Sequence, residues 1–457
     1  MLKISNTLTK EVEDFKPIIE GEVKMYHCGP TVYDYAHIGN LRAFLTADIL
    51  RRYFEHENYK VTQVMNITDV GQLSGDTDEG EDKMTIGLRR EGKQVSMESM
   101  KELADFYTER FKEDILSLNI LLPHHMPKAS EHIEEDIEII KILEDKGFTY
   151  KTTDGVYFSV AKDPHYGLLG GTGDVLNSEA RINTNTEKED PRDFALWKFN
   201  KNLGFPSPWG QGFPGWHIEC SAMSRKYLGE SFDIHTGGID LAPIHHNNEI
   251  AQSENACGCK FVNYWVHNEF LQLSENKMAK SAGNSITIRT IIKDGYSPLS
   301  YRYFLLLSHY KTPTNFTFEG LGAAETALKR LKDFFDTLPE GGKLNNKYHK
   351  KFLKALDSDL NTPEGLGITW QLVKDPKVSL EDKRETLLNF DKILGLHLLN
   401  NEFTVINIPS NIRKLLEERD LARIQGEWQK SDEIRESILK LGYEVMDTDE
   451  GPKLNKI

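Results

Sequence analysis

The sequence is short of the features that mark secreted, membrane-embedded and nucleic-acid-coating proteins. Only four cysteines occur among 457 residues, which is too few for a secreted disulfide framework. The N-terminal stretch, MLKISNTLTKEVEDFKP, is charged throughout and has no apolar run that would make a signal peptide or a membrane span. We therefore expect a cytoplasmic protein without membrane association. The formal net charge of −15 argues against bulk electrostatic binding of nucleic acid but is compatible with a local basic groove.

The length and the apolar content bound the architecture. A chain of 457 residues, 39% of them hydrophobic, is long enough for roughly three domains with buried cores. The sequence contains no internal repeat and no low-complexity tract. It predicts a multidomain globular protein.

The N-terminal part has the pattern of a parallel, doubly wound sheet. Residues 21–29 (GEVKMYHCG) read as a buried strand, residues 41–56 as a helix with one apolar face, and residues 60–68 (KVTQVMNIT) as the next strand. A strand, a helix and a strand in this order predict a βαβ unit, in which ligands bind at the carboxyl ends of the strands. Cys28 lies at such an end.

Two further regions depart from this pattern. Residues from about 123 to 208 mix a helix at 135–147 with strand candidates and a glycine-rich stretch, and strands of the first type resume at FDIHTGG and FVNYWVHNEFLQL. An insertion into the sheet domain explains the change. From about residue 319 the pattern is helical, and the tail from residue 412 reads as a small helical module of its own.

The segment Ala36-His37-Ile38-Gly39-Asn40 is a candidate phosphate site. Its glycine permits close backbone approach, and the helix that begins behind it would offer free N–H groups to an anion. His37 could then donate to charge that develops on a phosphoryl group. An ordinary loop with Asn40 as a helix cap also explains these residues.

The segment Lys277-Met278-Ala279-Lys280-Ser281 carries two lysines three residues apart on a loop. Lys277 and Lys280 could close over a triphosphate and neutralise its charge. The motif alone is weak evidence, because lysine pairs on surface loops are most often only solvated.

Four residues form a candidate metal site: Cys28, Cys220, His245 and Glu249. If residues 245–254 are helical, His245 and Glu249 lie four residues apart on one face and can converge on one ion. Two thiolates, an imidazole and a carboxylate suit Zn²⁺, although buried cysteines are also common without a metal. His246 would lie about 100° round the helix, so only one of the two histidines can pair with Glu249, and the spacing favours His245.

The remaining cysteines, Cys257 and Cys259, flank a glycine. A metal or redox pair is one reading of this CxC sequence. We interpret it as incidental, because it lies on a predicted turn after a helix.

Taken together, these segments resemble a known family. HIGN and KMAKS look like the paired signatures HIGH and KMSKS of class I aminoacyl-tRNA synthetases. The stretches MYHCGPTVYDYAHIGN, NITDVG, GWHIECSAM, HTGGID and KMAKSAGNSITIR resemble the cysteinyl-tRNA synthetases, in order and over nearly the whole chain.

The resemblance implies a set of functional residues. It makes Cys28, Cys220, His245 and Glu249 the ligands of one Zn²⁺ that receives the thiolate of substrate cysteine. It places the triphosphate of ATP, with Mg²⁺, against His37, Gly39, Asn40, Lys277 and Lys280, and the adenosine end near Asp240. It assigns the amino-acid pocket to Thr68, Trp216 and His235.

The sequence departs from the family at three positions. Asn40 replaces the last His of HIGH and Ala279 the first Ser of KMSKS, but the glycine and both lysines remain, so we expect activation to survive. Gln72 stands where the related subtype has His, and we expect no catalytic consequence.

The resemblance also implies the domain plan and the partners. The expected fold is α/β, with a Rossmann-type doubly wound parallel sheet interrupted by a connective insertion and followed by a helical bundle and a small anticodon-binding module. The expected boundaries are 1–122 and 209–263 for the catalytic domain, 123–208 for the insertion, 264–318 for the stem-contact region, 319–401 for the bundle and 402–457 for the module. The expected partners are L-cysteine, ATP and tRNA(Cys), bound by a monomer.

Two other hypotheses remain beside a cysteine–tRNA ligase. A ligase of the mycothiol-pathway type would use a similar site to join cysteine to an amino sugar, but it needs no anticodon module. A catalytically silent tRNA- or zinc-binding paralogue would not need HIGN, KMAKS and all four ligands.

Overall fold

The computed structural model describes residues 2–73, 80–170, 186–273 and 286–399, and parts of the stretch from 412 to 456. The chain divides into two compact units, Met1–Leu398 and Leu399–Ile457. Each unit is described by itself.

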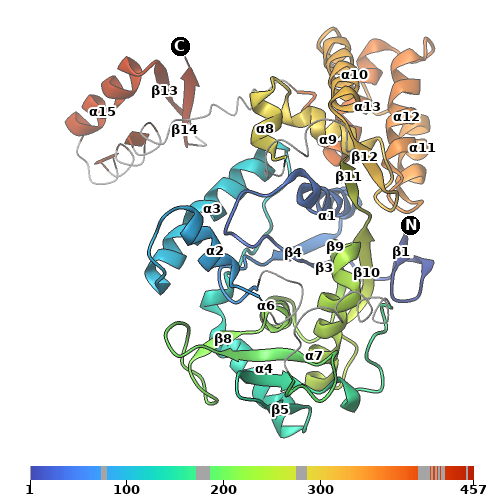
Figure 1. Cartoon of the computed structure of the whole chain (residues 1–457). Coiled ribbons are helices and arrows are strands. Elements are labelled where there is room, and N and C mark those ends of the chain that lie inside the picture. Colours follow the sequence, from blue (N-terminus) through green and yellow to red (C-terminus); the bar gives the residue numbers. More distant parts are fainter. Residues whose placement is uncertain are drawn as a thin grey trace. The chain divides into compact units, whose positions relative to one another are not determined.

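A four-stranded parallel sheet forms the centre of the first unit (Figure 1). Its strand order is β10-β9-β3-β4, with β10 at Val262–Asn268, β9 at Phe232–Gly238, β3 at Glu22–His27 and β4 at Lys60–Met65. Helix α1 (Ile38–His56) connects β3 to β4. The predicted doubly wound α/β fold is confirmed, because parallel neighbours joined through a helix are its defining unit.

The segment between β4 and β9 contains helices and a second sheet. Helices α2 (Lys83–Arg90), α3 (Met97–Ser117) and α4 (Ile133–Asp145) come first, with the short turn η1 (Ala129–Glu131) before α4. An antiparallel sheet follows, with the order β5-β6-β7-β8 at Thr149–Lys151, Gly155–Phe158, Phe194–Phe199 and Gly212–Pro214, and with η2 (Val160–Lys162) after β6. The sheet extends past residue 208, because β8 pairs with β7. Helix α6 (Trp216–Leu228) leads back to β9.

The turns after β9 lead into a helix with an unusual start. The short turn η3 (Ile239–Leu241) precedes η4 (Ala242–His246), a π turn, and η4 runs directly into α7 (Asn247–Cys257). A π turn is wider than an α turn by one residue, so it changes the direction in which the following side chains point.

Helices cover the C-terminal part of the first unit (Figure 1). After β11 (Leu271–Leu273), which pairs with β12 (Thr314–Phe316), come α8 (Ile288–Lys293) and α9 (Pro298–Leu306). The bundle helices are α10 (Phe318–Asp336), α11 (Asn346–Leu356), α12 (Thr362–Lys374) and α13 (Leu380–Leu394). The N-terminal hairpin pairs β1 (Lys3–Asn6) with β2 (Glu11–Asp14).

A buried arginine connects α1 to the helical bundle. The Arg302 guanidinium on α9 forms a 2.7 Å ion pair with Asp48 of α1 and donates to the carbonyl oxygens of Leu118, Asn119 and Leu394. Breaking one side of such a buried pair is costly, because the remaining charge loses its partner. Arg302 therefore holds α1, the helix that begins within HIGN, against the helical bundle.

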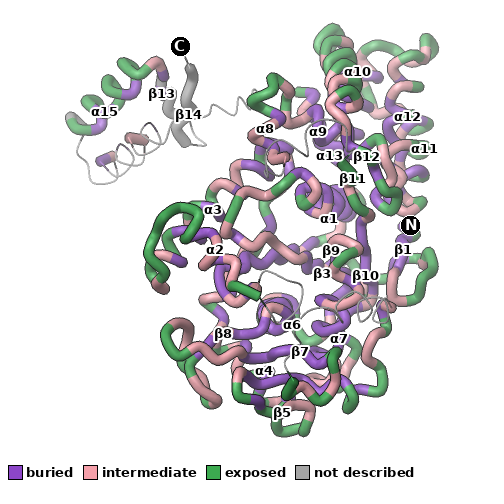
Figure 2. Tube along the Cα trace, viewed as in Figure 1, coloured by how far each residue is buried: buried purple, intermediate pink, exposed green. Residues whose placement is uncertain are grey.

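Figure 2 shows that the sheet strands and the inner sides of the helices of the first unit are buried. Val23 and Met25 of β3 and Ile234 of β9 pack in the main cluster with the apolar face of α1, and a separate cluster lies between α4 and the antiparallel sheet. The sheet strands are buried on both faces, as is typical of parallel sheets.

The second unit is small. It contains α15 (Trp428–Lys440) and the antiparallel pair β13 (Tyr443–Thr448) and β14 (Gly451–Lys456). Among its described residues, Ile412, Ile434, Ile438, Tyr443 and Val445 form one buried apolar cluster. Among all the described helices of the chain, none has the length and apolar composition needed to cross a membrane.

Candidate metal and nucleotide site

A cavity of about 490 Å³ opens at the carboxyl end of the parallel sheet. Cys28, directly after β3, lies in its wall, together with Trp216 and Cys220 of α6 and His245 of η4. The HIGN residues His37, Gly39 and Asn40 and the acidic Asp240 line the same cavity. The sequence motifs, which are far apart along the chain, therefore share one space at the strand ends, where doubly wound sheets bind ligands.

The HIGN segment forms the start of α1. His37 is the residue before the helix, in an extended conformation. A side chain at Gly39 would lie 2.9 Å from the His37 ring, so the glycine is what allows the imidazole to fold over the first turn. The N–H of Ile38 donates to the carbonyl of Ile286 and that of Asn40 to the carbonyl of His37, so the prediction of free N–H groups is wrong for these two residues.

His37 is an exposed residue whose side chain lines the cavity. Desolvation lowers its pKa below the ordinary value, and the nearby Asp240 carboxylate opposes that shift. At neutral pH the ring is consequently neutral. It can donate one hydrogen bond without adding a full positive charge.

Four potential metal ligands converge at the base of the cavity. One ligand atom from each of Cys28, Cys220, His245 and Glu249 lies within 4.8 Å of all the others. Cys220 and Glu249 are fully buried, and Nε2 of His245 lies 3.1 Å from Oε1 of Glu249. Helix α6, the π turn η4 and helix α7 each supply part of the set.

The second ring nitrogen of His245 has a defined partner. Nδ1 of His245 lies 2.8 Å from Nδ1 of His217, whereas Nε2 is buried and faces the cluster, 3.1 Å from Oε1 of Glu249. An imidazole held through one nitrogen and directed by the other is the usual arrangement of a histidine metal ligand. The geometry of this histidine therefore fits a metal site.

A second, overlapping set is also present. Cys28 and Glu249 combine with His235 and His246 within the same distance limit. Nε2 of His246 lies 3.3 Å from the Cys28 sulfur and 3.9 Å from Oε1 of Glu249. His245, which the spacing favours as the partner of Glu249, is the nearer of the two histidines at 3.1 Å. His246 also comes as close as 3.9 Å, because a π turn replaces the regular α-helix that the prediction assumed.

The charges in the cluster are strongly coupled. Burial raises the pKa of the Cys28 thiol well above its ordinary value. Burial also acts to raise the pKa of Cys220, but hydrogen bonds with Cys28 and His245 outweigh it and lower that pKa to about 6.

His245 and Glu249 form the charged partner pair in this cluster. Burial opposes both charges, yet the hydrogen bonds of His245 to Cys220 and Glu249 raise its pKa to about 10. His235 and His245 lower the pKa of Glu249 to about 2 in spite of burial. Without a metal, the cluster thus holds an imidazolium beside a carboxylate and a thiolate.

The other predicted site residues lie in different places. Trp216 lines the cavity, and the centroids of its ring and the His245 ring are 4.3 Å apart. Thr68 and His235 are buried behind the cavity lining: Thr68 donates to Oε2 of Glu219, and Nε2 of His235 lies 2.9 Å from Oε2 of Glu249. Lys277 and Lys280 lie outside the described residues.

Sequence reasoning missed several residues of this site. Lys83 lines the cavity, and its ammonium lies 5.8 Å from the centroid of the Trp216 ring. Gln72, for which the sequence suggested no catalytic role, also lines the cavity and accepts a hydrogen bond from Thr31. His217 is the second residue of α6, in the segment GWHIECSAM, but its position in the sequence does not indicate a contact with His245. The contact of His267 with His246, over 2.7 Å between Nε2 and Nδ1, likewise could not be predicted from the sequence.

Comparison with known proteins identifies the family. Residues 14–326 match the model of the class I (C) tRNA synthetase catalytic domain. The curated cysteine–tRNA ligase 1 of Burkholderia lata is 44% identical over 99% of this chain and 96% of its own length. The chain belongs to the cysteine–tRNA ligase family.

Other relatives in this family agree. The cysteine–tRNA ligases of Treponema denticola and Thermus thermophilus are 42% and 41% identical, and each alignment covers at least 98% of both chains. A solved methionyl-tRNA synthetase of Mycobacterium tuberculosis, in complex with methionyl-adenylate, superimposes with a TM-score of 0.54 over 82% of this chain and 90% of its own, at 13% identity. That likeness shows a shared fold. The full-length matches confirm the cysteine–tRNA ligase hypothesis over the mycothiol-type alternative.

Proposed function

We propose that the protein activates L-cysteine with ATP and Mg²⁺ to cysteinyl-adenylate and transfers the cysteine to the 3′ end of tRNA(Cys). The observation that carries the proposal is the convergence of Cys28, Cys220, His245 and Glu249, the first three of which line one cavity with HIGN. The family membership supplies the reaction class. The second unit, in this proposal, reads the anticodon.

The donor set supports one resident Zn²⁺ held by Cys28, Cys220, His245 and Glu249. It contains two sulfurs, and Nε2 of its histidine faces Oε1 of Glu249 at 3.1 Å. In the alternative set Nε2 of His235 pairs instead with the other carboxylate oxygen, Oε2, at 2.9 Å, and its ring stacks on Trp265, so that histidine is better placed to orient the carboxylate than to bind an ion. When bound, the zinc would ionise and hold the substrate thiol, which a serine hydroxyl could not match because it keeps its proton near neutral pH.

The cavity walls would position the other end of the substrate. Trp216 closes the amino-acid end, and Thr68, held by Glu219 and by Asn66, supports that wall from behind. A site with one strong contact for sulfur can reject the hydroxyl isostere without a second, editing site.

The residues at the start of α1 would bind the nucleotide. The neutral His37 donates to a phosphate oxygen, Asn40 adds an amide, and Asp240 lies toward the adenosine end. Lys277 and Lys280 would neutralise charge on the triphosphate during attack of the cysteine carboxylate on the α-phosphorus. Most of the rate would come from positioning and charge stabilisation, since no covalent step is asked of the protein.

We further propose that the protein acts as a monomer in the cytoplasm. The monomer follows from the family resemblance and from a site assembled within one chain.

Cysteine-dependent ATP–pyrophosphate exchange, measured together with bound zinc, tests the proposal. Wild type should exchange with cysteine and not with serine, and Cys220→Ser should lose both zinc and exchange. Cys259→Ser, a matched substitution outside the cluster, should keep both. Exchange that survives zinc loss would refute the metal assignment, and a zinc-loaded wild type without exchange would favour the catalytically silent paralogue.

A further inference from the structure

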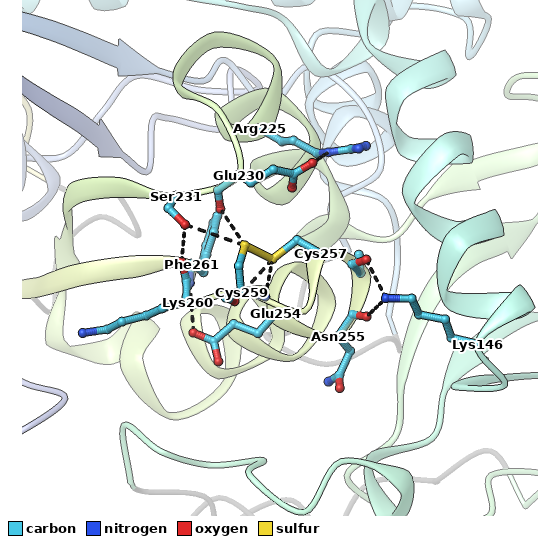
Figure 3. Close-up of a disulfide and its surroundings, with 11 residues drawn as sticks. Lys146, Arg225, Glu230, Ser231, Glu254, Asn255, Cys257, Cys259, Lys260 and Phe261 are labelled. Carbon is cyan, nitrogen blue, oxygen red and sulfur yellow. Dashed lines mark hydrogen bonds and ion pairs between the residues drawn. A yellow bond between two sulfur atoms is a disulfide. The ribbon is translucent and has the colours of Figure 1, made fainter. Parts of the chain in front are cut away.

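The two cysteines outside the metal cluster are joined to each other. Cys257, the last residue of α7, and Cys259 form a disulfide two residues apart, so the interpretation of the CxC sequence as incidental is wrong (Figure 3). Gly258 between them has φ +76°, the left-handed conformation that ends α7 and turns the chain back on itself. This turn is what brings the two sulfurs together.

The two sulfurs have different hydrogen-bond partners. The backbone N–H of Cys259 donates to the Cys257 sulfur over 2.9 Å, and that sulfur also lies 3.3 Å from the Cys259 carbonyl oxygen. The Cys259 sulfur lies 3.7 Å from the Ser231 hydroxyl and 3.9 Å from the Glu230 carbonyl oxygen, so its nearest donor is the more distant of the two (Figure 3). A direct N–H donor favours the thiolate form of a cysteine. Cys257 is therefore the better leaving group of the pair.

A lysine offsets the unfavourable position of Cys257 at a helix C-terminus. The end of a helix carries partial negative charge, which opposes a thiolate there. The Lys146 ammonium of the neighbouring segment donates to the carbonyl oxygens of Asn255 and Ala256, each over 2.9 Å, and places a positive charge beside the turn (Figure 3). The local electrostatics are consequently compatible with an ionised Cys257.

Small solutes can reach this turn. Cys257 and Cys259 are both partly exposed, and Gly258 and Lys260 are exposed. A side-chain carbon at Gly258 would meet no atom within 4 Å, so open space lies beside the turn. Neither the cavity at the sheet end nor the smaller one beside Arg42 is lined by Cys257 or Cys259, and the accessible feature is the disulfide bond itself.

We propose that Cys257 and Cys259 are a thiol–disulfide exchange site for low-molecular-weight disulfides such as cystine, separate from the metal cluster. In the forward direction the Cys259 thiolate attacks one sulfur of cystine. The cystine S–S bond breaks, a mixed disulfide forms on Cys259, and one cysteine leaves with its electron pair and takes up a proton.

The second step closes the protein disulfide. The Cys257 thiolate attacks the Cys259 sulfur, the mixed disulfide breaks, and the second cysteine leaves and is protonated. In total the two protein thiols lose two protons and two electrons, and cystine gains them to become two cysteines. Excess cysteine reverses both steps, so no further oxidant or reductant is needed.

The test follows the thiol state of the zinc-loaded full chain. The reduced protein is mixed with cystine and cysteine at a series of ratios, quenched with acid, alkylated and analysed by mass spectrometry of the peptide that contains both cysteines. Wild type should pass from two alkylated thiols to an internal disulfide as cystine increases, and should return when cysteine is added. Oxidised glutathione in place of cystine should give the same disulfide, because the bond rather than its substituents is recognised.

Two serine variants test the assignment of roles. Cys257→Ser should accumulate one cysteine adduct on Cys259, because the resolving thiol is missing. At a pH where both thiols are ionised, Cys259→Ser should form its adduct on Cys257 about tenfold more slowly, because the thiolate that the N–H donor stabilises is the weaker nucleophile. Both variants should retain zinc and cysteine-dependent pyrophosphate exchange, which also shows that they are folded.

Three results would overturn the proposal. Wild type that keeps both thiols at the highest cystine excess does not exchange, and wild type that keeps the disulfide in excess cysteine holds a structural bond. Equal adduct formation by the two variants would remove the assigned roles. Since thiol state is measured directly, failure here is distinguishable from failure of the proposed ligase activity.

Discussion

The chain holds two pairs of cysteines whose surroundings differ in nearly every respect. Cys28 and Cys220 lie at the carboxyl end of a parallel sheet, among buried histidines and a buried glutamate that set their protonation. Cys257 and Cys259 lie on a partly exposed turn, where backbone groups and one hydroxyl, none of them ionisable, approach the sulfurs. Burial, nearby charges and the course of the backbone thus suit one pair of cysteines to the proposed metal binding and the other pair to a disulfide.

The largest expected effect is the loss of zinc affinity when a candidate ligand beside the buried cysteine pair is replaced. Glu249→Gln replaces a carboxylate that two histidines hold ionised with a pKa of about 2. We expect at least about a thousandfold loss of zinc affinity, since changes behind a ligand already cost ten- to hundredfold. Competition with a chelating dye would measure it. Unchanged affinity would mean that the carboxylate lies outside the coordination shell.

The second-largest expected effect is the pH dependence of zinc affinity, which the protonation of the buried cluster sets and which the Cys257–Cys259 pair should not influence. In the zinc-free protein Cys28 keeps its proton and His245, with a pKa of about 10, keeps its own, whereas Cys220, with a pKa of about 6, is ionised at neutral pH. Zinc must displace both retained protons, so affinity should fall about a hundredfold for each pH unit lowered between about pH 10 and 6. Below about pH 6 the dependence should steepen as Cys220 protonates.

Calorimetry provides the direct count for that prediction. Zinc titrations in buffers of different ionisation enthalpy should give about two protons released per zinc at neutral pH. A count near zero would show that the zinc-free cluster is already deprotonated. The Cys259→Ser variant should give the same count as wild type.

A smaller effect should come from the histidine behind His245. His217→Ala removes the partner that lies 2.8 Å from Nδ1 of His245. Zinc affinity should fall by about ten- to hundredfold, because the ligand ring loses its orientation. His246→Gln is the matched comparison, since it changes a neighbouring buried histidine outside the assigned set. If His246→Gln released the zinc and His217→Ala did not, the overlapping set with His235 and His246 would be the true one.

The smallest expected effect is the change in the free energy of unfolding when the Cys257–Cys259 disulfide is reduced. Reducing the Cys257–Cys259 disulfide opens a loop of only three residues, so the free energy of unfolding should change by less than about 2 kcal/mol. Denaturant unfolding of the zinc-loaded protein with and without reductant measures it. A larger change would show that the turn supports the α7 segment as a structural crosslink.

Much of the sheet could be predicted from the sequence, because each part depends on a local pattern. The apolar run around β3, the amphipathic face of α1 and the next apolar run fixed a βαβ unit, and Cys28 followed as a strand-end residue. The candidate ligands could be named from the sequence because only a few side-chain types, those with a thiol, an imidazole or a carboxylate, bind Zn²⁺. Their convergence is a tertiary property, since Cys28 and Cys220 are separated by nearly two hundred residues of chain.

What the sequence could not reveal depended on backbone detail. The prediction for His245 and His246 assumed a regular α-helix, and the structure has a π turn there. The disulfide was dismissed because its formation depends on the left-handed Gly258, which a single sequence does not reveal. The hydrogen bonds of Ile38 and Asn40 at the start of α1 likewise come from the fold around them.

The π turn Ala242–His246 sets how this segment tolerates a change in length. It holds one residue more than an α turn over the same span, so deleting a single residue would restore regular winding and rotate everything upstream by about 100° relative to Glu249. Substitutions in the turn alter one side chain at a time, but a deletion would redirect two imidazoles together. Deleting one residue that precedes His245 in this turn should therefore be more severe than most point mutations in the cavity. Such a deletion removes none of the four candidate zinc ligands.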